Sequence, residues 1–228
     1  QASRALTYYA AKNVDLETGL SRKFETLKGS PDASAVRTRL KLVAAFNKML
    51  TPMAKYYGSE MSMRNAMSAI SVMGGSGYMK DYPCERYLRD SRITTIYEGT
   101  SQLQVVAAVA GVTGGLVKDV LVDIFGKEDW QGEHPRMTKL LAQLDEAIAF
   151  VKTRDKDYHD LCARKLVDTA ITLVNTALLF KCGKDEALTY WMMTRIPQAH
   201  AELEKVMSGY AGALADFEKL APAVPAAD

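Results

Sequence analysis

The sequence predicts an all-α protein: a helical bundle followed by a second, smaller helical extension. Apolar residues recur at spacings of three and four over most of the chain, and runs that favour β-strands are almost absent. Of the 228 residues, 48% are hydrophobic, which is sufficient for a sizeable buried core. We expect a helical-bundle domain over residues 1–115 and a helical extension domain over residues 116–228.

The expected helices of the first half are separated by glycine and proline. A first helix covers QASRALTYYAAKNVDLE, and a polar loop begins at Thr18. A long helix runs from about Ala33 to Leu50 and is expected to break or kink at Pro52, because proline fits the first turn of a helix but not its interior. A methionine-rich helix follows and ends at the glycines of GGSGY.

Two shorter helices are expected between the glycines of GGSGY and the middle of the chain. After a turn at residues 81–83, the stretch CERYLRDSRITTIYEG is typical of a helix that gives way to extended chain. The next helix begins at Thr100 or Ser101, where Ser101 and Gln104 have capping-box spacing. Three glycines between residues 111 and 115 interrupt it.

The second half shows a plainer helical pattern. LVKDVLVDIF resumes the helical spacing, and two apolar stripes between residues 135 and 178 predict two long helices. A third helix from Glu186 to about Leu220 contains Pro197 and is expected to be kinked or split there. Residues 221–228, APAVPAAD, are typical of a frayed tail. No cluster of reactive side chains falls on these helices, so we assign them to packing and to subunit contacts.

Composition and charge exclude several classes of protein. No run approaches the roughly 20 apolar residues that cross a bilayer, and the first residues lack the pattern of a signal peptide. Residues 1–115 carry 15 basic and 9 acidic side chains (+6), whereas residues 116–228 carry 14 and 18 (−4), so the first half suits an anionic ligand better. We expect no membrane span and no nucleic-acid partner.

The cysteines and histidines are too scattered for a zinc site or a disulfide framework. They are Cys84, Cys162 and Cys182, and His134, His159 and His200. We therefore expect no metal, and we expect reduced, buried thiols in a cytoplasmic protein.

Unusual residues crowd together in one segment, SVMGGSGYMKDYPCERYLRDSRITTIYEGTSQ. Gly74, Gly75 and Gly77 end a helix, and three glycines in four positions exceed what a helix C-cap needs. They allow a flat or phosphorylated ligand to approach the backbone closely, although a simple cap is the alternative. No strand precedes them, so they are not a dinucleotide-binding fingerprint. The methionines from Met49 to Met79 have the spacing of core residues, but they could also line a ligand slot.

Glu98 is the sharpest candidate for chemistry. It follows Ile96 and Tyr97, precedes Gly99 and stands just before a helix start. Partial removal from water by apolar neighbours would make the carboxylate a stronger base, whereas the positive end of the helix would favour its ionised form. Gly99 leaves room for a substrate beside it. The alternative is that Glu98 only supports the helix N-terminus, and these features do not separate the two interpretations.

The spacing of these residues resembles the C-terminal domain of the acyl-CoA dehydrogenase family. The residues that correspond to the family signature are Gly74, Gly75, Gly77, Tyr78, Asp81, Arg86 and Asp90, and IYEGT follows at the family's spacing. Ser71 stands at the opening position of the signature, where the family usually has Gln. The resemblance covers roughly residues 1–115. The extension is similar to that of the subfamily that includes 3-methylmercaptopropionyl-CoA dehydrogenases.

The resemblance implies an FAD-dependent enzyme that forms a double bond between the α and β carbons of an acyl-CoA thioester. Glu98 would remove the α-proton while the β-hydride passes to N5 of FAD, and the backbone N–H of Glu98 would hydrogen-bond the thioester carbonyl. Tyr97 and Gly99 would border the substrate. The residues expected to contact FAD are Ser71, Gly74, Gly75, Thr100, Ser101 and Gln102, with the glycine turn touching FAD that a neighbouring subunit mainly binds.

The resemblance also implies partners and a larger protein. An electron-transfer flavoprotein is the expected electron acceptor, and copies of the chain are expected to form a dimer or tetramer. Family members have an N-terminal helical domain and a middle β-domain that grip flavin and acyl-CoA, and these 228 residues contain neither. We therefore expect a piece of a longer protein that is inactive alone. Two alternatives are an acyl-CoA oxidase, which passes electrons to oxygen, and a non-catalytic helical scaffold.

Overall fold

The all-α prediction is confirmed. A computed structural model describes residues 1–216 and residue 219, and within these residues every regular element is a helix. The elements are α1 (Ala2–Thr26), α2 (Ala33–Met73), α3 (Gly75–Tyr78), α4 (Cys84–Thr94), α5 (Ser101–Thr113), α6 (Leu116–Phe125), the 3₁₀ helix η1 (Trp130–Glu133), α7 (Pro135–Lys152), α8 (Lys156–Lys181), α9 (Asp185–Met207) and α10 (Gly212–Ala215). The tail predicted over residues 221–228 lies outside the described residues.

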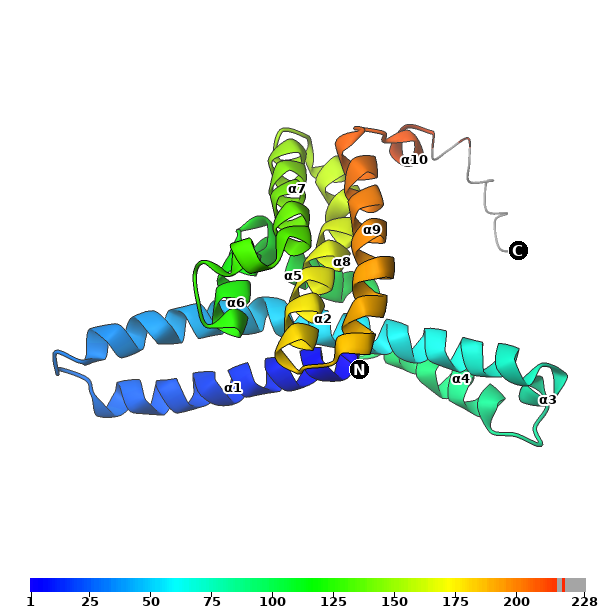
Figure 1. Ribbon diagram of the computed structural model, residues 1–228, viewed down its shortest axis with the longest axis horizontal. Coiled ribbons are helices and arrows are strands. Elements are labelled where there is room, and N and C mark those ends of the chain that lie inside the picture. Colours follow the sequence, from blue (N-terminus) through cyan, green and yellow to red (C-terminus); the bar gives the residue numbers. More distant parts are fainter. Residues whose placement is uncertain (217–218, 220–228) are drawn as a thin grey trace, which may run out of the picture.

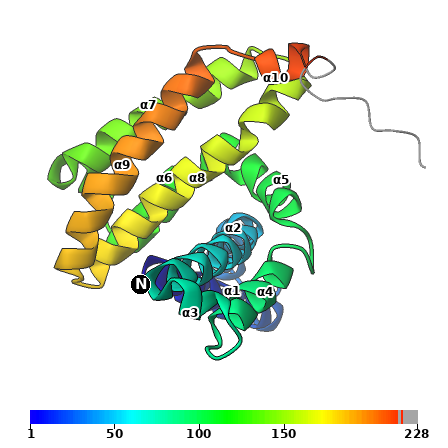
Figure 2. The same ribbon diagram turned by 90° about the vertical axis from the view of Figure 1, so that its right-hand side faces the viewer.

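The long helix α2 is the axis of the molecule. In Figure 1, α1 runs beside the first half of α2, and α3 and α4 lie along its second half, so that two arms point in opposite directions. Helices α7, α8 and α9 stand upright across the middle. Figure 2 shows α5 between this upright bundle and the layer of α1 to α4, and α5 packs on both α2 and α8. The candidate residues of the sequence therefore lie on one arm and at its junction with the bundle.

One cluster of buried apolar side chains joins the two halves of the chain. It includes Leu6 of α1, Phe46 of α2 and Val105 of α5, and it continues through Leu166 of α8 to Val206 of α9. The boundary expected between residues 115 and 116 falls at the turn between α5 and α6. The division into two domains stays a prediction, because the core itself shows no gap at that turn.

The break expected at Pro52 is wrong, because α2 continues through it from Ala33 to Met73. An interior proline costs a helix about 3 kcal/mol. Full burial of one large apolar side chain contributes about 1.5–3 kcal/mol, and Phe46, Met49, Leu50 and Met53 are each at most 1% exposed. Four such side chains around the proline outweigh its cost. The packing of α2 between α1, α4 and α5 thus overrides the local preference.

Two other expected boundaries are also wrong. The polar loop expected from Thr18 starts only after Thr26, because α1 pairs with α2: Nδ2 of Asn47 donates to the carbonyl of Asn13 (3.0 Å) and to Oε2 of Glu17 (2.6 Å). At the other end of the chain, α9 is not split at Pro197, and it ends at Met207 rather than near Leu220.

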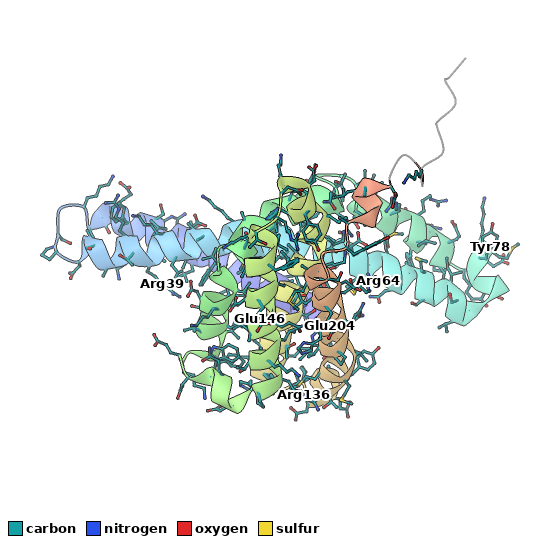
Figure 3. The ribbon with its side chains drawn as sticks, turned by 90° about the horizontal axis from the view of Figure 1, so that it is seen from above. Arg39, Arg64, Tyr78, Arg136, Glu146 and Glu204 are labelled. Carbon is teal, nitrogen blue, oxygen red and sulfur yellow. The ribbon has the colours of Figure 1, made fainter. Side chains whose placement is uncertain are left out.

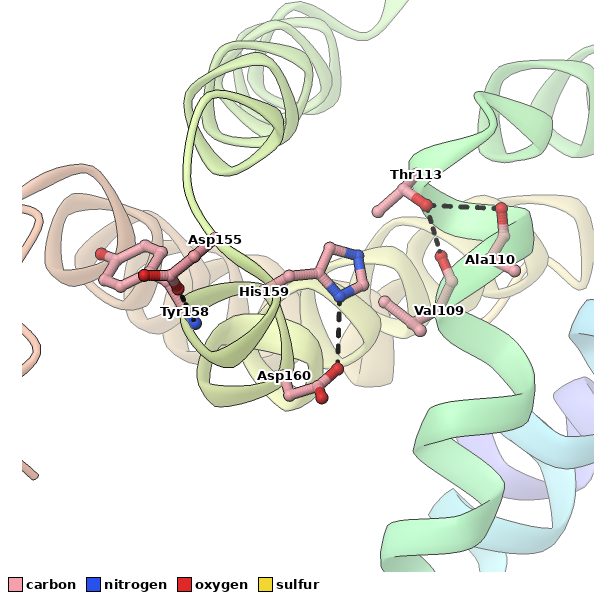
Figure 4. A network of polar contacts seen from close by, with 7 residues as sticks. All are labelled: Val109, Ala110, Thr113, Asp155, Tyr158, His159 and Asp160. Atoms are coloured by element: carbon pink, nitrogen blue, oxygen red, sulfur yellow. Dashed lines mark hydrogen bonds and ion pairs between the residues drawn. The ribbon is translucent and has the colours of Figure 1, made fainter. Parts of the chain in front are cut away.

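One side-chain cap, that of Asp155, lies at the junction between α7 and α8. Figure 4 shows Oδ1 of Asp155 accepting a hydrogen bond from the backbone N–H of Tyr158 at 2.8 Å, which starts α8. Nδ1 of His159 lies 3.5 Å from Oδ1 of Asp160 in the same turn. At the facing end of α5, the Thr113 hydroxyl donates to the carbonyl of Val109 at 3.0 Å. The three residues between Lys152 and Lys156 therefore make a tight antiparallel connection.

No single described helix is both long and apolar enough to cross a membrane. Among the described helices, only α5 and α6 taken together reach the length and apolar composition of a membrane-crossing helix, and the two are bent at 81° to each other.

Candidate active site

The segment from Thr95 to Thr100, which we call the Glu98 loop, connects α4 to α5. The extended chain expected here is wrong: the segment is a series of turns. The backbone N–H groups of Ile96 and Tyr97 both donate to the carbonyl of Ile93 at 3.0 Å, which continues the helical direction of α4 for one more turn. The chain then reverses direction at Glu98.

Glu98 has an unusual backbone conformation. Its φ is 52°, and it is the one non-glycine residue with positive φ among those that the structure describes. This left-handed conformation costs a non-glycine residue about 1–2 kcal/mol. Gly99 follows with φ of 93°, and a Cβ there would lie 2.8 Å from Nε2 of Gln104. Such strain persists only where surrounding contacts hold it, and it is concentrated at functional sites.

Three hydrogen bonds hold the Glu98 loop. Nζ of Lys55, on α2, donates to the carbonyl of Gly99 at 2.7 Å. Nε2 of Gln104, on α5, donates to the carbonyl of Glu98 at 3.0 Å. Across the loop, the backbone N–H of Ser101, the first residue of α5, donates to the carbonyl of Thr95 at 3.0 Å. Two helices and the loop itself therefore fix the backbone on both sides of the candidate base.

The cap of α5 differs from the expected capping box. Thr100 is the N-cap, and its hydroxyl accepts from the backbone N–H of Leu103 at 3.3 Å. The Ser101 hydroxyl donates instead to Oε1 of Glu60 on α2 at 2.6 Å, and Gln104 reaches past Ser101 to the Glu98 carbonyl. The Ser101–Gln104 capping box is thus wrong, because both side chains have partners outside the first turn.

The side chains around the candidate base face solvent. Glu98 is exposed, and Ile96 and Tyr97 are 46% and 48% exposed. The apolar neighbours predicted from the sequence are present, but within this chain they do not cover the carboxylate. Removal of Glu98 from water would therefore require a ligand or another segment to lie over Ile96 and Tyr97.

The glycine-rich turn lies at the far end of α4. Gly74 has φ of 58°, which favours glycine, and a Cβ on Gly77 would lie 2.9 Å from the Cβ of Met73. At Gly75, by contrast, a Cβ would meet nothing within 4 Å. Backbone conformation explains Gly74 and packing against Met73 explains Gly77, whereas the bare backbone at Gly75 leaves room for an external group.

The predicted site residues therefore form two groups. Tyr97, Glu98, Gly99, Thr100, Ser101 and Gln102 lie together in and after the Glu98 loop. Ser71, Gly74 and Gly75 lie at the other end of α4, whose 11 residues span about 16 Å. In Figure 3, Tyr78 marks the end of this arm, away from the bundle that carries Arg136, Glu146 and Glu204. The two groups are thus separated by about the length of α4. The roles assigned to these residues stay predictions.

The end of α5 nearest the loop also contacts the second half of the chain. Oε1 of Gln102 accepts from Nη2 of Arg164, on α8, at 3.4 Å. The Arg164 guanidinium lies 5.3 Å from the ring centroid of Tyr56 on α2. Ser101 is buried, whereas Gln102 is exposed, so Gln102 is the more accessible of these two expected flavin contacts.

Lys55 and Glu60 are contacts that the sequence pattern did not reveal. Both lie on the methionine-rich part of α2, roughly 40 residues before the loop that they touch. A lysine among Pro52, Met53 and Tyr56 was an available signal, because a half-buried cation needs a partner. The partner itself became identifiable only from the fold.

A largely apolar groove follows the arm next to the loop. Its volume is about 680 Å³, and it is lined by Met63, Met67 and Ile70 of α2 and by Leu88, Ile93 and Ile96 of α4 and the loop. The methionines thus fall into two sets, and the role of the second set in a ligand slot stays a prediction. Met49 and Met53 are buried core residues, whereas Met63 and Met67 line this groove.

Two further clefts involve the late helices, where the sequence indicated only packing. One, of about 100 Å³ between α2, α8 and α9, contains Tyr57 and Trp191, whose rings meet edge to face, and burial raises the pKa of Tyr57 to about 12. The other, of about 810 Å³ between α7 and α9, contains His200, whose ring Nδ1 contacts Oε1 of Gln143, and burial lowers the pKa of His200. Their residues come from separate helices, so no local motif announces them.

The described part of the chain contains no group of three or more His, Cys, Asp or Glu side chains arranged to hold a metal ion. Cys84 and Cys162 are buried, as expected, but Cys182 is exposed, so the expectation of a buried thiol is wrong at Cys182. Cys182 is the residue directly after the last residue of α8.

Comparison with known proteins finds a family model that matches the central segment. Residues 33–112 match the family model described as the acyl-CoA dehydrogenase C-terminal domain. The match runs from the start of α2 into α5 and includes both the glycine-rich turn and the Glu98 loop. This segment is therefore similar to the C-terminal domain of acyl-CoA dehydrogenases.

Similar proteins are acyl-CoA dehydrogenases and a related reductase subunit. An acyl-CoA dehydrogenase of Bacillus subtilis is 46% identical over 63 residues (28% of this chain and 17% of the relative). The mitochondrial short/branched chain specific acyl-CoA dehydrogenase of Rattus norvegicus is 56% identical over 52 residues (23% and 12%). The caffeyl-CoA reductase–Etf complex subunit CarC of Acetobacterium woodii is 52% identical over 52 residues (23% and 14%). The matches thus span less than a fifth of each relative.

Proposed function

We propose that this chain supplies the C-terminal helical domain of an FAD-dependent acyl-CoA dehydrogenase, with Glu98 as the base that removes the α-proton of an acyl-CoA thioester. The observation that carries the proposal is the Glu98 loop: a carboxylate on a left-handed backbone, held from two helices, beside exposed Ile96 and Tyr97. This loop lies inside the segment that is similar to the C-terminal domain of acyl-CoA dehydrogenases.

The chemistry assigned to the chain is proton removal and stabilisation of charge. The Glu98 carboxylate takes the proton from the α-carbon of the thioester, and the backbone N–H of Glu98 donates to the thioester carbonyl, where negative charge develops. An acyl chain over Ile96 and Tyr97 would exclude water and strengthen the base. When bound, FAD accepts the β-hydride at N5, so that the substrate loses one proton and one hydride and gains a double bond.

The residues available to FAD fit a flat, anionic ligand. Thr100 and Gln102 are exposed at the start of α5, a helix of 13 residues whose N-terminus favours negative charge. At the other end of α4, the exposed turn with Gly74 and Gly75 offers bare backbone, with Ser71 one turn earlier on α2. Because the two groups are far apart, we propose that they serve different FAD molecules in a homo-oligomer, either a dimer or a tetramer.

The remaining parts of the active protein are proposed to come from outside residues 1–228. The matches cover only 12–17% of the three relatives described above, so most of each relative has no counterpart in the match. We propose that this chain alone is inactive. An electron-transfer flavoprotein is the proposed acceptor, a cytoplasmic location is proposed, and a 3-methylmercaptopropionyl-CoA type of substrate is the finer proposal.

Flavin bleaching tests the proposed function. The FAD-loaded protein that contains residues 1–228 is mixed without oxygen with acyl-CoAs of different chain length, and flavin absorbance is followed in a stopped-flow instrument. Glu98→Gln should slow bleaching by about 10³-fold or more, since it removes the base. Glu25→Gln, an exposed carboxylate near the end of α1, is the matched control and should bleach normally.

Two outcomes would contradict the proposal: no thioester bleaches the flavin, or Glu98→Gln bleaches at the normal rate. The first outcome would favour the non-catalytic scaffold. The reoxidation step separates the dehydrogenase from an oxidase, because an oxidase yields peroxide in air and a dehydrogenase reduces an electron-transfer flavoprotein.

A further inference from the structure

The backbone of Glu98 is held by side chains on two consecutive carbonyls. Glu98 and Gly99 both have positive φ, at 52° and 93°. The carbonyl of Glu98 accepts from Gln104, and the next carbonyl, that of Gly99, accepts from Lys55. The Gln104 bond fixes the peptide plane that directly follows the Cα of Glu98, and the Lys55 bond fixes the next plane. Together they hold Gly99 and the peptide that sets ψ of Glu98, on which the direction of the Glu98 side chain depends.

We propose that Lys55 and Gln104 are positioning residues for the base: they hold Glu98 in its left-handed conformation so that its carboxylate meets the α-proton of the thioester. This inference rests on the proposed function of Glu98. Neither side chain needs to touch substrate or flavin in this role. Both act through the backbone of Glu98 and Gly99.

Lys55 is suited to this role because it is itself restrained. Its side chain is half-buried on α2, its Nζ lies 2.7 Å from the Gly99 carbonyl, and the same Nζ lies 5.7 Å from the ring centroid of Tyr97. A hydrogen bond from a charged donor is stronger than one between neutral groups. Lys55 therefore contacts both the backbone carbonyl directly after Glu98 and the ring of Tyr97, the side chain that would border the acyl chain.

Gln104 is suited for a different reason. Its Nε2 occupies the space beside Gly99, where a Cβ would come within 2.8 Å. The absence of a side chain at position 99 thus has a second use besides access for substrate: it lets the Gln104 amide reach the Glu98 carbonyl. Gln104 lies on the first turns of α5, which Thr100 caps, so that the amide projects from a fixed helix end.

The local consequence is testable in the 228-residue chain without flavin. Lys55→Met keeps the length of the side chain but removes the donor. Amide hydrogen exchange of the loop, read at the Ser101 N–H that bonds to the Thr95 carbonyl, should become about tenfold faster in Lys55→Met. Lys48→Met, an exposed lysine on the same helix, is the matched control and should leave exchange unchanged.

The catalytic consequence is tested in the FAD-loaded protein that contains residues 1–228. The probe is the best substrate of the bleaching screen, together with its analogue in which sulfur replaces the β-carbon, so that no hydride can leave. Exchange of the α-hydrogens of this analogue with D₂O, followed by mass spectrometry, reports proton removal alone. Lys55→Met and Gln104→Leu should each slow this exchange about 10- to 100-fold, which is the usual effect of a displaced catalytic group.

Three further readouts distinguish positioning from a general loss of structure. The dissociation constant of the thioester and the flavin content should stay within about twofold of wild type, because the variants displace the base rather than remove binding contacts. Lys55→Arg, which keeps a charged donor, should recover most of the exchange rate. Lys48→Met should behave as wild type in both assays.

The outcomes separate this inference from the proposed function. If Glu98→Gln exchanges α-hydrogens as fast as wild type, or no thioester bleaches the flavin, the proposed function fails and the inference fails with it. If Glu98→Gln abolishes exchange while Lys55→Met and Gln104→Leu match wild type, the inference alone is overturned. A parallel loss of thioester affinity and proton exchange, without recovery in Lys55→Arg, would also overturn it.

Discussion

Glycine at position 98 is expected to stabilise the folded chain relative to alanine, which is the reverse of the order at an ordinary helical position. The reason is the φ of 52° at Glu98. A non-glycine residue in this conformation costs about 1–2 kcal/mol. Glycine avoids that cost but loses about 0.5–1 kcal/mol more backbone entropy on folding than alanine does. The free energy of unfolding of Glu98→Gly should therefore exceed that of Glu98→Ala by about 0.5–1 kcal/mol.

Urea unfolding of the 228-residue chain, followed by helical circular dichroism, measures this difference. With an m-value of about 3 kcal/mol/M, the midpoint for Glu98→Gly should lie about 0.2–0.3 M above that for Glu98→Ala. Lys48, exposed in the middle of α2, is the matched position, and there the order should reverse, because glycine is about 0.8–1 kcal/mol worse than alanine in a helix. Equal midpoints for the two Glu98 variants, or a lower one for glycine, would refute the claim that the loop is strained. Both variants lack the carboxylate, so the loss of its charge affects both midpoints equally and cannot account for the difference between them.

Three further effects follow from the packing. Gly77→Ala should lower the free energy of unfolding by about 1–3 kcal/mol, because the new Cβ would lie 2.9 Å from the Cβ of Met73, whereas Gly75→Ala enters open space and should be neutral in the same urea titration. Asp123→Asn should lower the melting temperature, because Asp123 accepts from Tyr9 at 2.8 Å and from Arg39 at 2.5 Å, and the expected cost is about 1–3 kcal/mol; an unchanged melting temperature would mean that the network contributes nothing. Stability should fall as the pH rises from 10 to about 12, because burial raises the pKa of Tyr57 from 10.0 to about 12 and the unfolded chain therefore releases its proton first. Burial raises the pKa of Tyr9, Tyr56 and Tyr158 as well, so Tyr57→Phe should reduce this dependence without removing it, and an identical pH profile would contradict the prediction.

The helical fold and the position of the loop could be predicted from local pattern because both depend on short spacings. The period of apolar residues identified the long helices, and glycines marked the ends of α2 and α5. The helix boundaries at Thr18, Pro52 and Leu220 were wrong for a common reason. Each was set by local propensity. At Thr18 and Pro52 the contacts of α1 and α2 continue the helix, as those that bury Pro52 inside α2 show, whereas α9 ends two residues before Gly209, whose φ is positive.

The candidate base could be located from the sequence, but its surroundings could not. Glu98 was identified by its neighbours Tyr97 and Gly99, which are adjacent in the chain. Its left-handed backbone is held by hydrogen bonds from two other segments, one from Lys55 on α2 and one from Gln104 on α5. Gln104 was noticed, but for a capping role with Ser101 that Thr100 fulfils instead. A spacing pattern can identify which residue carries a charge, but not which distant donor fixes its direction.

The second half of the chain contributes to the site through its longest helix. α8 packs on α5, and its Arg164 donates to Gln102 at the start of α5 and lies over the ring of Tyr56, the residue after Lys55 on α2. Arg164 of α8 therefore contacts both helices that hold the loop: α2, which carries Lys55, and α5, which carries Gln104. Because Lys55 and Gln104 can hold the backbone of Glu98 only if α2 and α5 keep a fixed distance, we expect α8 to affect the position of the proposed base. These contacts of Arg164 with Gln102 and Tyr56 were not indicated by the sequence, in which the extension was assigned only to packing and subunit contacts.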